Sequence, residues 1–282
     1  MIKKSCANKL AMFLALALIV AGVSFAQRVG DTVQVSGQPY AIESINGDRI
    51  TLLKQQAQGD GPVNWVAVPD STFGTSVING VAWGNNTWVA VGNNGRIAYS
   101  ADGRSWTAVA PGTNAGQSTF GTSNINAVAF GNNLFIAVGV NNRMASSPDG
   151  RTWTAVTSSF GTSTTGDNNI YGIAYGGGRW VAVGASGKTA YSTDGRTWTA
   201  VSAADIFDGS LYNSIYDVAY ANNRFVAVGI RGKIAYSSNG QSWTAVANSG
   251  GFVDSNIIYA VAYGNGRFVA VGTNGRMVYC DW

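Results

Sequence analysis

Short apolar runs separated by turn residues, in a repeating order, make up most of this chain. Five copies of one pattern begin at Ile78, Ile125, Ile170, Ile215 and Ile258. Each copy has an Ile-x-x-Val-Ala-aromatic run (Ile in place of Val in the third copy), a turn of Gly, Asn or Ala, and a second run such as Trp-Val-Ala-Val-Gly. Apolar runs with a period of two, bounded by such turns, predict β-strands joined in hairpins. The pattern therefore predicts an all-β protein.

The spacing of the copies indicates how these strands are organised. The glycine that ends the second run stands at Gly92, Gly139, Gly184, Gly229 and Gly272, in steps of 47, 45, 45 and 43 residues. A third run follows, and a fourth begins with Trp in the sequence Trp-x-Ala-Val. Four short strands in a unit of roughly 40–50 residues are typical of a β-propeller, with one antiparallel blade per repeat. We predict a five-bladed β-propeller over residues 61–282.

The fifth copy ends at Trp282, before its fourth strand. A matching segment, Asn64-Trp65-Val66-Ala67-Val68, precedes the first copy. We predict that residues 64–68 supply the outer strand of the last blade and close the ring, because closure hides strand edges that a linear array exposes. The alternative is an open stack of sheets with a frayed end.

The N-terminal region predicts a targeting segment and a small appendage. Residues 1–26 combine lysines, an apolar run that ends at Val23, and Ser24-Phe25-Ala26, which predicts a signal peptide cleaved after Ala26. The protein would then be secreted, periplasmic or at the cell surface, with no membrane span after cleavage; an uncleaved anchor is the alternative. Residues 27–60 predict three short strands, with a hairpin turn at Asn46-Gly47, and a polar linker.

Composition excludes several classes of function. The chain has no histidine, and Glu43 is its one glutamate, which rules out His-based catalytic triads and His metal sites. After residues 1–26, 15 basic and 14 acidic residues remain, so charge gives no argument for nucleic acid. Cys280 is then the one cysteine, so no intrachain disulfide forms. We expect a monomer without a metal or cofactor.

A turn before the fourth strand resembles the Asp-box, or BNR, repeat of the sialidase-like propellers. The chain reads Ser-Ala-Asp-Gly-Arg-Ser-Trp at residues 100–106 and has three further copies, each one residue shorter between Asp and Trp than the family pattern. The resemblance covers residues 60–282 and implies a propeller of the non-enzymatic secreted type. We expect a structural role, in which Asp or Asn accepts backbone N–H bonds and Trp buries apolar surface. The positions concerned are Asp102, Trp106, Asp149, Trp153, Asp194, Trp198, Asn239 and Trp243.

Three recurring positions are candidates for ligand binding at the end of the blades that carries the long connections. A basic residue follows each turn between the second and third strands and could hold an anionic ligand or be a solvated edge. A phenylalanine in each long connection could stack on a sugar or cap the space between blades. Tyrosines begin three of the inner strands. These residues are Arg96, Arg143, Lys188, Lys233 and Arg276; Phe73, Phe120, Phe160, Phe207 and Phe252; and Tyr171, Tyr216 and Tyr259.

These features lead to three hypotheses about function. The first is a non-catalytic propeller that binds a protein or cell-envelope partner through its loop face. The second is a multivalent lectin with one weak site per blade. The third is a sialidase-like glycoside hydrolase, which we do not favour because such enzymes generally need two carboxyl groups around one bond and only Asp217 begins an inner strand. We predict no catalytic residue.

Overall fold

The computed structural model describes strands at 32–35, 38–46 and 49–54 and the residues 65–110, 119–160, 168–202 and 213–281. The chain divides into two compact units, Met1–Ala67 and Val68–Trp282. The first unit holds one antiparallel sheet of three strands: β1 (Thr32–Val35), β2 (Gln38–Asn46) and β3 (Arg49–Lys54). Within the part of the chain described, no helix has the length and apolar character of a membrane span.

The second unit contains five antiparallel sheets whose strands follow one another in chain order, which confirms the all-β prediction. The first sheet is β4 (Ile78–Gly84), β5 (Thr87–Gly92), β6 (Ile97–Ser100) and β7 (Thr107–Ala108). The second is β8 (Ile125–Gly131), β9 (Leu134–Gly139), β10 (Met144–Ser147) and β11 (Thr154–Ala155). The third is β12 (Ile170–Gly176), β13 (Arg179–Gly184), β14 (Lys188–Ser192) and β15 (Thr199–Ser202). The fourth is β16 (Ile215–Ala221), β17 (Arg224–Gly229), β18 (Ile234–Ser237) and β19 (Thr244–Ala245). The fifth is β20 (Ile258–Gly264), β21 (Arg267–Gly272) and β22 (Met277–Asp281).

The core lies between neighbouring sheets, and the alternation of large and small residues explains why. In β9, Ile136 and Val138 pack against the third sheet, whereas Phe135 and Ala137 pack against Val89 and its neighbours in the first sheet. All six residues of β9 are buried, since this strand has a sheet on each face. Small residues on one face allow the next sheet to approach closely, so the repeated Val-Ala-Val run produces stacked sheets.

The hairpin turns adopt the backbone conformation that their residues favour. Asn85 and Asn86, between β4 and β5, have φ angles of 44° and 53°, and Asn132 and Asn133 repeat them with 46° and 54°. Two successive residues at positive φ match the right-handed twist of the flanking strands. Asparagine and glycine tolerate this region, which explains their recurrence between the first two strands of every copy.

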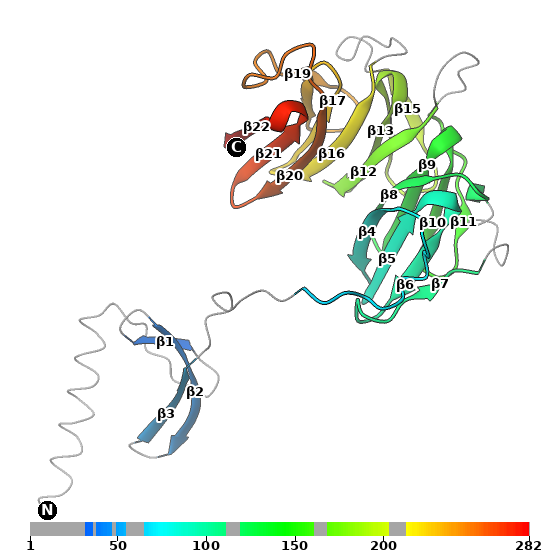
Figure 1. The fold of residues 1–282 in the computed structure, drawn as a ribbon. Helices are drawn as coiled ribbons and strands as arrows, with labels where there is room; N and C mark the ends of the chain where they lie inside the picture. Colours follow the sequence, from blue (N-terminus) through cyan, green and yellow to red (C-terminus); the bar gives the residue numbers. More distant parts are fainter. Residues whose placement is uncertain are drawn as a thin grey trace, which may run out of the picture. The chain divides into compact units, whose positions relative to one another are not determined.

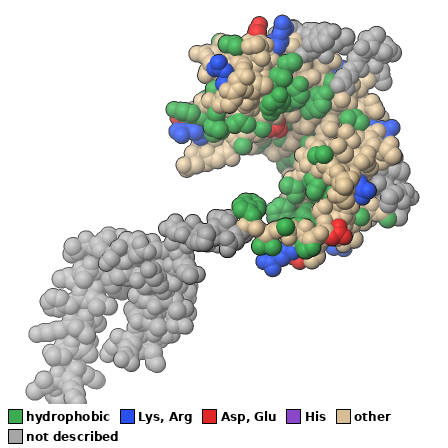
Figure 2. All heavy atoms as spheres, viewed as in Figure 1, with side chains coloured by type: hydrophobic (Ala, Val, Ile, Leu, Met, Phe, Trp, Pro, Cys, Tyr) green, Lys and Arg blue, Asp and Glu red, His purple; other side chains and the backbone are tan. Residues whose placement is uncertain are grey.

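The five sheets form a row in which contacts follow chain order, from β4 to β8, β12, β16 and β20 (Figure 1). The two ends of this row leave apolar side chains exposed. Val81 and Trp83 are exposed on the first sheet, and Met277 and Tyr279 on the fifth. Apolar side chains reach the surface over both ends in the space-filling view (Figure 2). Interior sheets have no counterpart of these surfaces, because each is covered on both faces.

The fifth sheet has three strands instead of four, and the predicted closing strand is not observed. Residues 65–68 belong to no strand, and Trp65 is 94% exposed. Among the described strands, β22 pairs with β21 alone. The closure of the ring by residues 64–68 is therefore not confirmed, and it stays a prediction.

Candidate functional site

We call the first strand of each sheet its inner strand: β4, β8, β12, β16 and β20. Five side chains, one near the start of each inner strand, lie at one end of the sheets. In each inner strand the pairing register shifts by one residue after the first position, which is the mark of a β-bulge. The residue at the bulge is unpaired in the ladder, so its side chain is aimed differently from its neighbours. We call these five positions the bulge row: Asn79, Asn126, Tyr171, Tyr216 and Tyr259.

The three tyrosines of the bulge row form a continuous aromatic surface across three sheets. The ring centroids of Tyr171 and Tyr216 are 5.4 Å apart, and those of Tyr216 and Tyr259 are 5.9 Å apart. Both pairs are tilted, at 39° and 56°, a favourable arrangement for aromatic rings. Tyr259 is 53% exposed, and the other two rings are half-buried. The structure thus brings together the three tyrosines that the sequence singled out.

The two asparagines of the bulge row connect neighbouring sheets. The Asn79 side-chain Nδ2 donates to the Ile125 carbonyl oxygen at 2.8 Å, and the Asn126 Nδ2 donates to the Ile170 carbonyl oxygen at 2.8 Å. Asn79 Nδ2 also lies 2.9 Å from Asn93 Oδ1, in the turn between β5 and β6. Sequence reasoning did not select these asparagines, although they occupy the same repeat position as the tyrosines. That shared position was the signal that could have found them.

Asp217 lies next to Tyr216 and holds two sheets together. Its Oδ1 accepts the N–H of Val218 at 2.8 Å, and its Oδ2 accepts the N–H of Val261 in β20 at 2.9 Å. Burial raises the pKa of this carboxyl, and the two N–H bonds oppose that shift. Both oxygens are already engaged with backbone donors of the protein. Asp217 therefore serves as a clamp between the fourth and fifth sheets.

The basic residues after the turns contact the long connections. Arg96 Nη1 donates to the Thr72 carbonyl oxygen at 2.9 Å, Arg143 Nη1 to that of Phe120 at 2.6 Å, and Arg276 Nη1 to that of Gly251 at 2.8 Å. Lys188 Nζ lies 2.6 Å from Asn168 Oδ1. Lys233 occupies the equivalent position of the fourth sheet. These cations hold the connections in place, a role that neither sequence interpretation anticipated.

The phenylalanines of the long connections are buried, which agrees with capping. Phe73, Phe120, Phe160 and Phe252 have between 0% and 6% of their surface exposed. Phe120 packs in the core between the first two sheets, and Phe252 in the core between the last two. Buried to this extent, they present no surface on which a sugar ring can stack, so we remove them from the candidate site. Phe207 lies outside the described residues.

The Ser-x-Asp-Gly turns have the scaffold geometry that their chemistry suggests. Asp194 Oδ1 accepts the N–H groups of Arg196 at 2.8 Å and Thr197 at 2.7 Å, and Ser192 Oγ accepts that of Gly195 at 2.8 Å. Asp102 and Asp149 repeat these contacts, and Asn239 makes them with its amide oxygen. The indole N–H groups of Trp106, Trp153 and Trp198 donate to the glycine carbonyl of the same turn.

These bonds lower the pKa of the turn carboxylates. Backbone N–H bonds, led by Ser105 for Asp102 and by Thr197 for Asp194, bring the pKa of each carboxyl to about 2. At Asp149 burial acts in the opposite direction, but the N–H bonds from Thr152 and Arg151 outweigh it, and the pKa is lowered. Each carboxylate is committed to its own turn. Within the described residues, no group of three or more Cys, Asp or Glu side chains is placed to hold a metal ion.

Comparison with known proteins identifies the type of fold but does not assign the chain to a family. No family model matches the chain, and no curated protein sequence matches it. Among solved structures it is similar to YCF48 from Cyanidioschyzon merolae, with 19% identity, a TM-score of 0.54, and coverage of 72% of this chain and 66% of that one. A structure of YCF48 bound to D1 peptide shares 15% identity, with a TM-score of 0.51 and coverage of 92% and 76%. The WD40 β-propeller domain of Doa1 shares 13%, with a TM-score of 0.50 and coverage of 73% and 65%. These similarities show a fold of the β-propeller type.

Proposed function

We propose that this protein is a non-catalytic β-propeller that binds a protein partner, in the form of an extended peptide segment, across its bulge row. The observation that carries the proposal is the aromatic surface of Tyr171, Tyr216 and Tyr259, which joins three sheets and ends in a ring that is 53% exposed. The similar propeller with a bound peptide supports this choice of partner class.

The chemistry of the row suits a peptide. Tyrosine gives a large contact area for a small loss of side-chain entropy, and it is enriched at protein interfaces for that reason. The tyrosine hydroxyl groups add donors and acceptors for a peptide backbone, and the amide oxygens of Asn79 and Asn126 add acceptors. With 15 basic and 14 acidic residues after the predicted signal, the net charge gives no reason to expect a strongly charged partner. An extended segment could contact three neighbouring sheets at once.

The test is selection from a phage-displayed peptide library, followed by affinity measurements on the selected peptides. The variant Tyr171→Ala/Tyr216→Ala/Tyr259→Ala should weaken binding by at least about tenfold, since aromatic hot-spot residues commonly contribute more than about 1.4 kcal/mol. The control is Tyr279→Ala, an exposed tyrosine on β22 away from the row. Equal affinity of the triple variant and the control would exclude the bulge row as the binding surface.

A lectin is the second candidate, and it rests on the same exposed tyrosine. An aromatic face next to amide groups also suits a sugar ring, whereas the buried phenylalanines no longer contribute. A glycan array separates the two candidates. Binding to a glycan class that the triple tyrosine variant loses would favour the lectin, and an array without signal would remove it.

We propose that the protein is not an enzyme, because the single carboxylate at the start of the inner strands is bound to two backbone N–H groups. Fluorogenic sialosides are the substrates to test. Their cleavage by the wild type, abolished in Asp217→Asn, would overturn this part of the proposal.

The finer predictions about processing and assembly belong to the same proposal. We expect a signal peptide cleaved after Ala26, a secreted or periplasmic monomer, and a five-bladed ring closed by residues 64–68. The resemblance to the Asp-box propellers stays part of the proposal as well. Mass spectrometry of the exported protein gives the mature N-terminus, and sedimentation gives the oligomeric state.

A further inference from the structure

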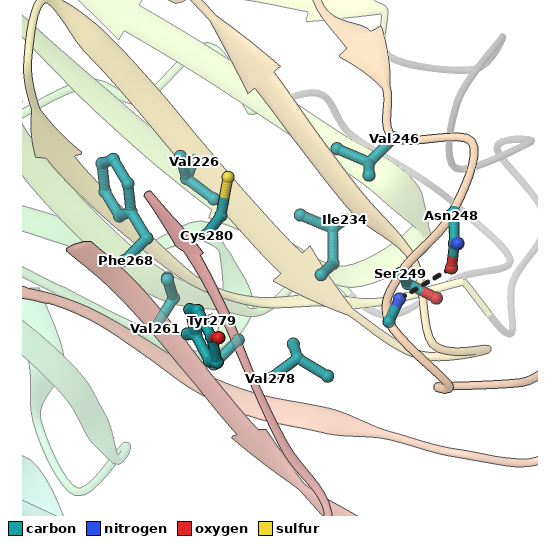
Figure 3. Close-up of a pocket in the computed structure, with 12 residues that line it drawn as sticks. Val226, Ile234, Val246, Asn248, Ser249, Val261, Phe268, Val278, Tyr279 and Cys280 are labelled. Carbon is teal, nitrogen blue, oxygen red and sulfur yellow. Dashed lines mark hydrogen bonds between the residues drawn. The ribbon is translucent and has the colours of Figure 1, made fainter. Parts of the chain in front are cut away.

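A cavity lies between the fourth and fifth sheets, beside the outer edge of β22, with which no described strand pairs. Its volume is about 190 Å³, and its walls are almost entirely apolar (Figure 3). Val226, Ile234 and Val246 line it from the fourth sheet, and Phe268 and Val278 from the fifth. A cavity of about 150 Å³ is enough to hold a benzene molecule, so this one can accept an aromatic side chain.

The equivalent space between the second and third sheets is filled by a tryptophan. Trp198 is 4% exposed and packs in the cluster that contains Ile136, Met144 and Val156 of the second sheet. The repeat places Val226, Ile234 and Val246 at those same three positions of the fourth sheet. The walls of the cavity thus correspond to the walls of the Trp198 site, two sheets further along the chain. Among the described strands, the fifth sheet has none in the place of the fourth strand that carries this tryptophan.

The residues along the outer edge of β22 also indicate a place for a further strand. In the complete sheets the position before the Asp or Asn turn is a serine with at most 2% of its surface exposed: Ser100, Ser147, Ser192 and Ser237. The fifth sheet has Cys280 at this position, and Cys280 is exposed. In the other sheets the turn that leads into the fourth strand folds over this serine, as the N–H of Gly103 donates to Ser100 Oγ at 2.9 Å. A strand added to β22 would therefore cover Cys280.

We propose that the cavity and the edge of β22 form a binding site for a Trp-x-Ala-Val strand, and that its occupant is the segment 64–68 of this chain, with Trp65 in the cavity. The segment reads Asn-Trp-Val-Ala-Val, against Thr-Trp-Thr-Ala-Val at residues 197–201. A tryptophan that is 94% exposed gains a large apolar contact by entering the site. This inference deepens the ring closure proposed above and rests on it for the choice of occupant.

The register of the added strand follows from the third sheet. There Ala190 pairs with Ala200, and Tyr191 with Thr199. At the equivalent positions of the repeat, Val278 would pair with Ala67, and Tyr279 with Val66. The indole of Trp65 then lies next to Cys280. The single thiol of the mature chain thereby becomes a reporter for occupation of the site.

The test measures the rate at which a maleimide labels Cys280 in the full chain carrying Cys6→Ser. With the site occupied, labelling of the otherwise wild-type chain should be slow. Trp65→Ala should raise the rate by roughly 100-fold, the factor expected when a buried indole no longer holds a local structure closed. Val66→Pro is the second variant, because it keeps the indole but disrupts strand pairing. Circular dichroism checks that both variants fold.

A peptide in trans separates the binding site from ring closure. A synthetic peptide of residues 62–70, added to the Trp65→Ala chain, should slow the labelling again, whereas the same peptide with alanine in place of tryptophan should not. Fast labelling of the wild type with protection by the peptide would retain the site and overturn closure by the chain's own segment. Protection that grows with protein concentration would assign the occupant to a second copy and overturn closure within one chain. Fast labelling in every case would overturn the binding site itself.

Discussion

The third and fifth sheets are built from the same repeat, but only the third is complete. In the third sheet β15 pairs with β14, and Trp198 fills the space toward the second sheet. In the fifth sheet β22 pairs with no described strand other than β21, and an apolar cavity and an exposed cysteine lie beside it. The difference shows that the fourth strand contributes a tryptophan that seals the core between two sheets, as well as hydrogen bonds. The fourth strand is only two to four residues long, and its pairing positions that indole.

The largest expected effect compares the two tryptophans that serve these sheets. Trp198→Ala should lower the free energy of unfolding by about 3–5 kcal/mol, the range for truncation of a buried tryptophan. If residues 64–68 complete the fifth sheet, Trp65→Ala should cost a similar amount in urea unfolding. An unchanged midpoint for Trp65→Ala, beside a large loss for Trp198→Ala, would leave the fifth sheet open.

A pair of glycines tests whether the first and fifth sheets meet. A Cβ on Gly95 would lie 2.1 Å from the Gly121 carbonyl oxygen of the following connection, at φ +64°. Gly95→Ala should cost about 2–4 kcal/mol, from the clash and the left-handed backbone together. Gly275 holds the same place in the fifth sheet, at φ +65°, and nothing lies within 4 Å of its Cβ position.

Closure of the ring would bring the first connection against Gly275, so we expect Gly275→Ala to cost as much as Gly95→Ala. Thermal unfolding of the two variants, measured side by side, gives the comparison. A cost for Gly275→Ala of only about 1–2 kcal/mol, the strain of the left-handed backbone alone, would indicate that the two sheets stay apart.

The Ser-x-Asp-Gly turn precedes the fourth strand of the complete sheets, and we expect its disruption to cause a smaller loss of stability. Asp194→Ala removes the acceptor of two backbone N–H bonds and should cost about 1–2 kcal/mol. The folded pKa of Asp194 is about 2, below its ordinary value of 3.8, so its ionised form stabilises the fold above pH 4. That contribution is lost as the pH falls toward 2.

Asp194→Asn gives this turn the amide that Asn239 provides in the fourth sheet, and should therefore flatten the loss of stability between pH 4 and pH 2. Urea unfolding across this range measures the slope. An identical slope in the wild type and in Asp194→Asn would contradict the role assigned to the carboxylate.

The smallest effect concerns the clamp between the fourth and fifth sheets. Asp217→Asn keeps one acceptor oxygen of two and should cost about 1 kcal/mol. Because burial raises the folded pKa of Asp217, this group stabilises the fold at low pH, and its contribution falls as the pH rises from 3.8 through the folded pKa. The variant should lose that dependence, which is opposite in sign to that of Asp194. A variant with the pH dependence of the wild type would remove Asp217 as its source.

Local features of this protein could be predicted from its sequence, and contacts between distant segments could not. The hairpins followed from Asn and Gly at positive φ, and the second strands from the Val-Ala-Val alternation. The partner of Asp217 is the backbone N–H of Val261, 44 residues away, and no local pattern marks it. Likewise the sequence presented Arg143 as one of five basic residues that could bind an anion or form a solvated edge. In the structure its guanidinium donates to the Phe120 carbonyl oxygen. A repeat indicates which residues are equivalent, whereas the contacts of each position depend on the neighbouring sheet.

The most direct test of strand addition to the fifth sheet is a pair of engineered cysteines in the chain that carries Cys6→Ser and Cys280→Ser. Ala67→Cys and Val278→Cys should form an intrachain disulfide under mild oxidation, since directly opposed residues of neighbouring strands lie within the Cα separation that a disulfide spans, about 4.4–6.8 Å. The matched control is Ala190→Cys with Ala200→Cys, the observed pair of the third sheet. We predict that both pairs oxidise at similar rates. Rapid oxidation of the control pair, with both thiols of the Ala67–Val278 pair still reactive, would contradict the account.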